Sequence, residues 1–255
     1  MKSIVKRLFR ATGFDLRRFG SVDHSGYDLE HDLPQVVTKP TPICFDVGAN
    51  SGQTIRKLHR IFEEPEIYAF EPSSNAFQGL IDQGYESAAS LSNLALGEEE
   101  GDAVLINNET STLSSILELE QSHENPFRDR KTSSQEKVAV STVDKQMEKF
   151  GIEKLDLLNS DTQGFEARVL RGAKRALSAG NIGAVLVEIN FARLYSDQSS
   201  AAEIMQILSE HGVHLVDIYE KVRKQGPTLA WCTALFAGSE WANGKCVIEV
   251  TGLHA

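Results

Sequence analysis

The sequence has few cysteines and no long apolar stretch. Its cysteines are three in number and widely spaced, without a Cys-x-x-Cys pair, at Cys44, Cys232 and Cys246. This pattern argues against a disulfide framework and a cysteine zinc site, and it fits a reducing, cytoplasmic compartment. No segment approaches the roughly 20 apolar residues of a membrane span. The first residues also lack the continuous apolar core and small-residue cleavage site of a signal peptide.

What is present is an ordinary globular composition. The chain has 255 residues, of which 41% are hydrophobic and 24% are charged. These fractions exclude a disordered, collagen-like or coiled-coil protein. A chain of this length forms one large domain or two small ones and can bury a sizeable core.

The charge is distributed unevenly. The formal net charge is −10, which disfavours nucleic acid as a partner, yet residues 1–20 carry six basic residues against one acidic residue. We predict a basic N-terminal extension and linker over 1–40 and a single acidic domain over 41–255. The apolar spacing within 1–20 fits either a helix packed on the domain or a peripheral membrane contact at the inner membrane face.

From residue 43 onward, short apolar runs alternate with segments of helical periodicity. The runs predict strands at 43–47, 66–70, 88–96, 103–107, 137–141, 155–158, 184–187, 213–219 and 231–237. Helices are predicted at 55–62, 76–81, 144–150, 164–177 and 200–211. The alternation predicts an α/β fold with a doubly wound, mostly parallel sheet. The last two strands are joined through Gly226-Pro227 without a helix, which predicts an antiparallel hairpin at one edge.

Polar residues stand at the predicted strand ends. They are Asp46, Glu71, Asn93, Asp161 and Glu188. In an open α/β sheet the ligand crevice lies at the carboxyl ends of the strands, so we expect these groups to converge there. Each acid alone would be an ordinary capping or surface carboxylate, and their joint placement is what indicates a site. Residues 108–137 are mostly polar and predict a long loop, of the kind that forms lids or binding loops.

The first strand leads into a glycine-containing turn that departs from two common nucleotide motifs. Counted from Gly48, the second and third glycines of Gly-x-Gly-x-x-Gly are replaced by Asn50 and Gln53, and no P-loop is present. Glu71 follows Gly52 by nineteen residues, where a carboxylate can accept both ribose hydroxyls. A ligand with a ribose, a cationic centre and no phosphate suits acidic strand ends. S-adenosylmethionine has these features.

Several sequence blocks then carry a family resemblance. The blocks are FDVGANSGQ (45–53), FEPS (70–73), NLALG (93–97), STLSS (111–115), LLNSDTQGFE (157–166), VLRGA (169–173) and VEI (187–189). In this order over about 43–195, they resemble the FkbM-type methyltransferases, a branch of the S-adenosylmethionine-dependent class. The resemblance implies a Rossmann-like class I methyltransferase sheet. The chain departs from the family at Asn159, where a lysine is frequent.

The resemblance also implies roles for individual residues. Gly48, Asn50 and Gly52 would let the backbone approach the methionine part of the cofactor, and Asp46 would hold its ammonium group. Glu71 would hold the ribose. Asn93 is a candidate near the adenine, or else a turn residue.

The reaction implied by the resemblance is methyl transfer to a hydroxyl group of a sugar, glycan or other small molecule. A hydroxyl acceptor needs a base, for which Asp161, Glu188 and His123 are candidates. Asp161 is the first choice because the fourth strand of such sheets ends beside the transferable methyl. A divalent metal held by Asp161 and Glu188 stays open, since hard cations take carboxylates. The sequence does not give the acceptor or the oligomeric state.

Two other functions are compatible with parts of the pattern. A methyltransferase-fold binding module without catalysis would fit the departure at Asn159 and the polar Ser160. A nicotinamide-dependent oxidoreductase would share the fold, but the two missing glycines argue against it.

Overall fold

The computed structural model describes residues 28–123, 125–223 and 227–238. The basic segment 1–20, Cys246 and Gly226 of the predicted turn lie outside the described residues, so the predicted extension and membrane contact stay predictions. Within the described residues, no helix is long and apolar enough to cross a membrane.

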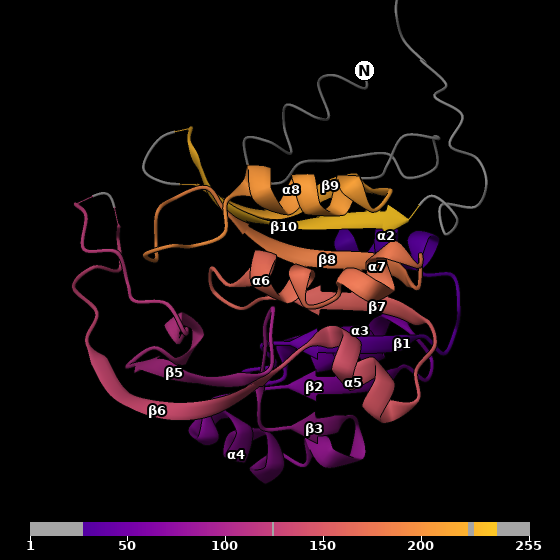
Figure 1. Ribbon diagram of the computed structural model, residues 1–255, viewed down its shortest axis with the longest axis horizontal. Coiled ribbons are helices and arrows are strands. Elements are labelled where there is room, and N and C mark those ends of the chain that lie inside the picture. The colour runs from indigo at the N-terminus through magenta and orange to yellow at the C-terminus, as the bar shows by residue number, and fades with distance from the viewer. Residues whose placement is uncertain (1–27, 124, 224–226, 239–255) are drawn as a thin grey trace, which may run out of the picture.

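A seven-stranded sheet forms the centre of the fold (Figure 1). In spatial order its strands are β3 (Ser90–Ser92), β2 (Glu66–Phe70), β1 (Ile43–Val47), β7 (Leu155–Ser160), β8 (Ile182–Asn190), β10 (Leu229–Gly238) and β9 (Val213–Arg223). All neighbouring pairs are parallel except those of β10, which runs antiparallel to both β8 and β9. The predicted doubly wound sheet with an antiparallel hairpin at one edge is confirmed.

Helices cover both faces of this sheet. On one face are α2 (Leu29–Val36), α3 (Gln53–Ile61) and α4 (Ser74–Asp82), with the short helix η1 (Tyr85–Ser87) after them. On the other face are α5 (Val143–Phe150), α6 (Glu166–Arg171), α7 (Lys174–Ser178) and α8 (Ala201–Glu210). The central strands β7 and β8 are therefore buried on both sides, which explains their nearly continuous apolar sequence.

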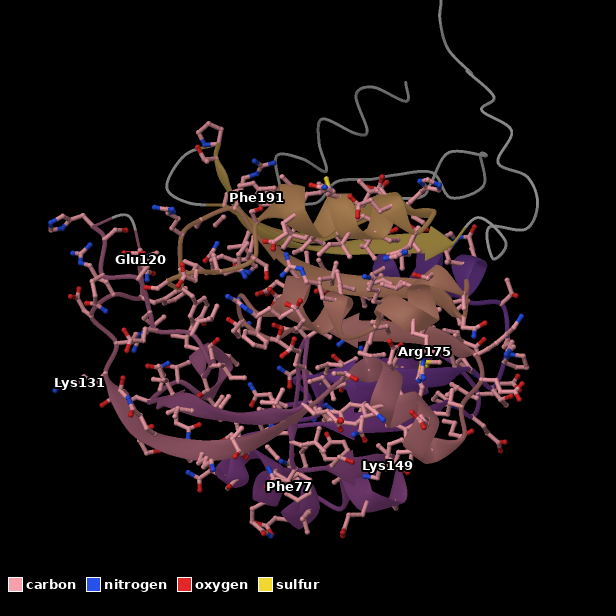
Figure 2. All side chains as sticks on the ribbon, in the orientation of Figure 1. Phe77, Glu120, Lys131, Lys149, Arg175 and Phe191 are labelled. Atoms are coloured by element: carbon pink, nitrogen blue, oxygen red, sulfur yellow. The ribbon has the colours of Figure 1, made fainter. Side chains whose placement is uncertain are left out.

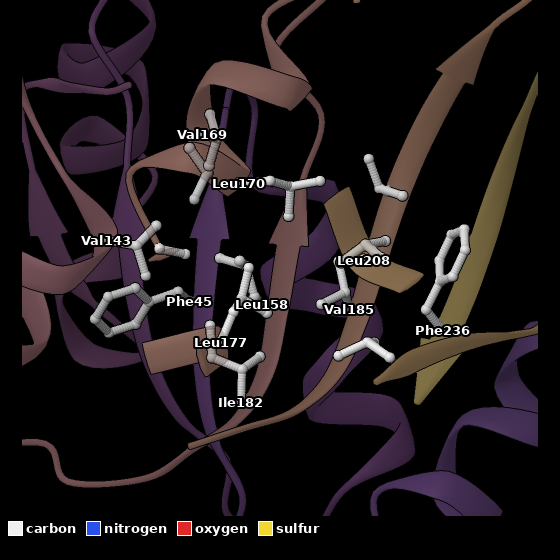
Figure 3. Close-up of a cluster of buried hydrophobic side chains, with 14 of the residues drawn as sticks. Phe45, Val143, Leu158, Val169, Leu170, Leu177, Ile182, Val185, Leu208 and Phe236 are labelled. Carbon is white, nitrogen blue, oxygen red and sulfur yellow. The ribbon is translucent and has the colours of Figure 1, made fainter. Parts of the chain in front are cut away.

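The larger core lies beneath the second group of helices. Figure 3 shows Phe45 and Leu158 of the central strands beside Val143, Leu170 and other helix residues. These side chains are almost fully buried. Burying a side chain of this size stabilises the fold by about 1.5–3 kcal/mol. The rigid framework behind the strand ends rests on this packing.

A second, three-stranded sheet stands at the end toward which the parallel strands point (Figure 1). Its order is β4 (Ala95–Leu96), β6 (Thr132–Ser141) and β5 (Gly101–Asn108), and the short helix η2 (Ser111–Leu113) follows β5. The predicted loop 108–137 is therefore shorter, because the first half of β6 is a polar strand that pairs with β5.

Three predicted elements were wrong in detail. The predicted strand 88–96 is divided into β3 and β4, which belong to different sheets, and residues 88–89 form a turn after η1. The predicted helix 164–177 breaks into α6 and α7 around Gly172, where an added Cβ would lie 1.9 Å from the Gly97 carbonyl oxygen. The predicted linker before residue 41 contains α2, whose Leu29 and Leu33 pack into the core.

Candidate active site

The turn after β1 places backbone, rather than side chains, at the edge of the sheet. Gly48 has φ +90°, and a Cβ there would lie 2.0 Å from the Asp161 carbonyl oxygen. Asn50 also has a positive φ, +44°. The Gly48 N–H donates to the Phe70 carbonyl (2.9 Å), which ties the turn to β2. Glycine at position 48 is therefore required by both its conformation and its surroundings.

Glu71, directly after β2, is held by two backbone amides. Its Oε2 accepts from the Asn50 N–H and its Oε1 from the Ser73 N–H, both at 2.8 Å. Burial raises the pKa of Glu71 to about 7, although the two amide bonds oppose that shift. Each oxygen keeps a further lone pair for a ligand. The carboxylate is thus fixed in place by the fold itself.

Asp46, at the end of β1, is buried beneath the turn. Its Oδ1 accepts a hydrogen bond of 2.8 Å from Asn159 Nδ2, while Oδ2 has no partner among the described residues. Burial raises the pKa of Asp46 to about 7. Asn159 satisfies one oxygen without supplying a positive charge. Asp46 therefore stays an uncompensated acid behind the turn.

A cavity of about 370 Å³ opens above these residues. Of the predicted site residues, Gly48, Asn50, Glu71 and Asp161 line it. The lining that the structure describes contains carboxylates and amides but no Lys, Arg or His side chain. The cations Lys149 and Arg175 lie on α5 and α7, away from this end of the sheet (Figure 2). The cavity thus suits a cationic or neutral ligand and would repel phosphate.

The second sheet forms the opposite wall. Asn107 and Asn108 at the end of β5 line the cavity, and the buried Asn108 Oδ1 has no partner among the described residues. Glu136 of β6 accepts from Asn107 Nδ2 (2.7 Å) and from the Ser74 hydroxyl (2.6 Å). Burial alone would raise the pKa of Glu136, but its hydrogen bonds together outweigh that effect and lower the pKa below its ordinary value. Glu136 thereby connects the second sheet to the beginning of α4.

Asp161 and Glu188 meet at the ends of β7 and β8. Gln163 Nε2 lies 2.7 Å from Asp161 Oδ1 and 3.2 Å from Glu188 Oε1. Burial raises the pKa of both carboxyls, that of Glu188 to about 9 with a further contribution from the Asp161 charge. Glu188 therefore holds its proton near neutral pH, whereas a carboxyl beside it that stays ionised can act as a general base.

Glu166 stabilises the turn that follows Asp161. Its Oε1 accepts from the backbone N–H groups of Thr162 and Gly164, both at 3.0 Å. Burial raises the pKa of Glu166 to about 7. Its role is to fix the turn at the beginning of α6.

Five of the predicted residues lie outside the cavity lining: Asp46, Gly52, Asn93, His123 and Glu188. Gly52 begins α3 with φ +76°, packed against the Tyr85 ring. Asn93 Nδ2 donates to the carbonyls of Glu71 (2.8 Å) and Pro72 (3.1 Å), which is the turn role that the sequence had left open. His123 is exposed on the loop between η2 and β6, and the structure does not bring it to the cavity. We therefore no longer consider it a candidate base.

Sequence reasoning missed other contributors. Gln163 and Tyr195 connect the two carboxyls to the neighbouring loops, and Asn107 and Asn108 supply polar groups to the wall. The paired asparagines at a strand end were a usable signal. Among the described residues, no three His, Cys, Asp or Glu side chains are grouped to hold a metal ion.

Comparisons with known proteins bear on the family of this chain. The family model described as the methyltransferase FkbM domain matches residues 46–215. The 2-O-methyltransferase NoeI of Sinorhizobium fredii is 23% identical over 196 residues, which cover 72% of this chain and 78% of that protein. The solved FkbM methyltransferase of Methylobacillus flagellatus has 16% identity and a TM-score of 0.48, with 78% of this chain but only 44% of that chain covered. The magnesium protoporphyrin IX methyltransferase of Synechocystis, solved with bound S-adenosylmethionine, has 13% identity and a TM-score of 0.42, covering 93% and 97% of the two chains. From the extent of the family match, the chain belongs to the FkbM methyltransferase family.

Proposed function

We propose that the protein is an S-adenosylmethionine-dependent O-methyltransferase. The acceptor is a hydroxyl group of a sugar, a glycan or another small secondary metabolite. The observation that carries the proposal is the acidic cavity at the strand ends, whose described lining has no cationic side chain. A pyrophosphate cofactor would meet repulsion there, which argues against the nicotinamide alternative.

The residues around the cavity fit this cofactor. The open backbone at Gly48 and Asn50 would receive the methionine part, because a side chain at Gly48 would collide with Asp161. The uncompensated Asp46 would attract the ammonium across the turn. Glu71, held by two amides, would accept the ribose hydroxyls through its free lone pairs.

The chemistry requires positioning and a base. When bound, S-adenosylmethionine supplies a methyl group already activated by a sulfonium. Holding the acceptor oxygen in line with that carbon contributes up to roughly 7–11 kcal/mol in favourable cases. Asp161 would take the hydroxyl proton as the C–O bond forms and the C–S bond breaks, so the products are the methyl ether, S-adenosylhomocysteine and protonated Asp161.

The acceptor class follows from the polar character of the opposite wall. Asn107, Asn108, Ser114 and Ser115 supply amides and hydroxyls there. These groups form hydrogen bonds with hydroxyls in either direction, which suits a polyhydroxylated acceptor. The 2-O-methyltransferase activity in the name of the Sinorhizobium relative is consistent with this class.

Cofactor binding is the first test. We expect calorimetry to show that S-adenosylmethionine binds the wild-type protein and that Glu71→Gln weakens binding about tenfold, because the new amide donor would face the Asn50 or Ser73 N–H. Glu66→Gln is the matched control, since Glu66 is exposed at the other end of β2. Absence of binding to the wild type, or equal affinities of both variants, would contradict the cofactor assignment.

Methyl transfer is the second test. Methyl-labelled S-adenosylmethionine is incubated with cell extract, and labelled products are identified by mass spectrometry, with Asp161→Asn as the comparison. We expect a labelled hydroxyl compound with the wild type and at least a hundredfold less with the variant. A non-catalytic binding module would bind the cofactor and label nothing.

A further inference from the structure

The Gln163 side chain lies between the two carboxyls of the site. Its Nε2 approaches Asp161 Oδ1 and Glu188 Oε1 at 2.7 and 3.2 Å. A primary amide carries two hydrogens, so one can point to each acid. Gln163 adopts a positive φ of +55°, uncommon for a residue with a Cβ, which turns its side chain back toward β7 and β8.

Tyr195 fixes the direction of this amide. Its hydroxyl donates to Gln163 Oε1 (2.9 Å), so the oxygen faces Tyr195 and the nitrogen faces the acids. Tyr195 is 1% exposed. Its hydroxyl also lies 3.3 Å from the Leu113 carbonyl on the loop that lines the cavity. On the far side, Asn190 Nδ2 donates to Glu188 Oε1 (3.2 Å).

The surrounding residues do not supply enough positive charge to neutralise both Asp161 and Glu188. Charged groups on several neighbouring elements interact with one or both carboxyls: Lys57 of α3, Glu220 of β9, Glu166 of α6, Asp46 of β1 and Glu71 after β2. Two further titratable groups, Tyr195 and Cys232, also face them. Lys57 is the cation among them, and it pairs with Glu220 at 2.7 Å. Two acids bound to one nitrogen repel when both are ionised, so one of them retains a proton.

We propose that Tyr195 and Gln163 are positioning residues that hold Asp161 and Glu188 as a pair sharing one proton. The shorter hydrogen bond from the amide favours the ionised form of Asp161, and repulsion between the two acids keeps Glu188 protonated. Asp161 Oδ2 is then left to accept the proton of the acceptor hydroxyl. The Tyr195 hydroxyl oxygen also lies 3.3 Å from the Leu113 carbonyl oxygen, which places this pair beside the segment after β5 that lines the cavity. The inference rests on the proposed function, in which Asp161 is the base.

The pair is tested on the protein alone by carbon-13 NMR titration of its labelled carboxyl groups, assigned with Asp161→Asn and Glu188→Gln. We expect two well-separated titration steps in the wild type and closer steps in Tyr195→Phe. The matched control is Tyr68→Phe, which removes the hydroxyl bonded to Glu66 at the opposite end of β2 and should leave both steps unchanged. Gln163→Met, which removes both amide bonds, serves if Tyr195→Phe unfolds. Independent titration of the two acids in the wild type would overturn the proposal, as would a variant titration that superimposes on the wild-type one.

A kinetic test separates positioning from stability. A positioned base contributes roughly 10²- to 10⁴-fold to the rate. Loss of its alignment in Tyr195→Phe or Gln163→Met should therefore lower kcat about tenfold and shift the pH profile of kcat. The KM for the cofactor should stay within about twofold of the wild-type value, because neither Tyr195 nor Gln163 is among the residues proposed to bind the cofactor. Values of kcat and pH profiles that are equal in the variants and the wild type would overturn the proposal. Failure of the proposed function would instead appear as absent cofactor binding in calorimetry, so the two failures are distinguishable.

Discussion

The carboxylates at the strand ends are held in two different ways. Glu71 and Glu166 accept hydrogen bonds from backbone N–H groups, whose positions are set by the turns after β2 and β7. Asp46, Asp161 and Glu188 instead accept them from side-chain amides. Backbone N–H donors persist through most substitutions, whereas a single substitution removes a side-chain donor. The first group is therefore built into the fold, and the second can be changed residue by residue.

The difference distinguishes Glu71 from the pair of Asp161 and Glu188, whereas Asp46 on β1 is held by a side chain and Glu166 on α6 by the backbone. The backbone-held Glu71 lies on the β1–β2 side, where the cofactor is proposed to bind. The side-chain-held Asp161 and Glu188 lie on the β7–β8 side, where the proton is proposed to move. Substitutions such as those of Gln163 can thus change the acids on the β7–β8 side while the position of Glu71 stays fixed.

The largest effect is expected where the two halves touch. Gly48→Ala would place a Cβ 2.0 Å from the Asp161 carbonyl at a positive φ, so it should lower the free energy of unfolding by about 3 kcal/mol and displace both halves. Gly84→Ala is the matched control, since Gly84 has φ +78° but no atom within 4 Å of an added Cβ. It should cost only about 1 kcal/mol, the contribution of the backbone conformation. Urea denaturation measures both, and equal losses would show that the contact with Asp161 has no role.

The sequence predicted where the acidic residues lie better than it predicted the hydrogen bonds that hold them. Strand alternation placed Asp46, Glu71, Asp161 and Glu188 at or near the ends of parallel strands, where the structure also has them, because such strands end at one edge of the sheet whatever their side chains do. The Gln163 contact could not be predicted, since a positive φ turns the side chain and leaves no periodic pattern. Tyr195 is 32 residues further along the chain than the glutamine it contacts, and only the folded structure joins them.

Two elements escaped prediction for separate reasons. The first half of β6 is polar and exposed on both faces, so it shows no alternation, and its pairing with β5 supplies the strand. Helix α2 lies in a polar segment that ends at Pro40 and Pro42, and these features predict a linker. The spacing of Leu29, Leu33 and Val37 carried the signal of a buried helical face, and all three pack in the core.

The pH dependence of stability tests whether both kinds of carboxylate are protonated in the folded state. The pKa values of Asp46, Glu71 and Glu166 are raised to about 7, from 3.8 or 4.5. The folded protein therefore binds more protons than the unfolded chain. Their stabilisation is complete below about pH 4 and is lost as the pH rises toward and through 7, and Glu188 extends this loss toward 9.

We expect the cofactor-free protein to have a free energy of unfolding at least about 2 kcal/mol lower at pH 8 than at pH 5.5, which is the contribution of a single carboxyl with its pKa raised to about 7. Glu136 and Glu220, whose pKa values are lowered, act in the opposite direction, but their contribution is lost mainly at more acidic pH. Urea denaturation at both pH values and constant ionic strength measures the difference. Stability that is equal or higher at pH 8 would mean that these acids are ionised without penalty in the folded protein.

The smallest effect comes from converting one side-chain-held acid into an ion pair. Asn159→Lys restores the residue frequent in the family and brings an ammonium group near Asp46, which should lower the pKa of that buried acid. The loss of stability between pH 5.5 and pH 8 should then shrink by about 1 kcal/mol. Asn159→Met, similar in length but neutral, removes the hydrogen bond without adding charge and should enlarge the loss. If both variants shift the pH dependence in the same direction, the hydrogen bond of Asn159, rather than the charge near Asp46, sets the behaviour of this half of the site.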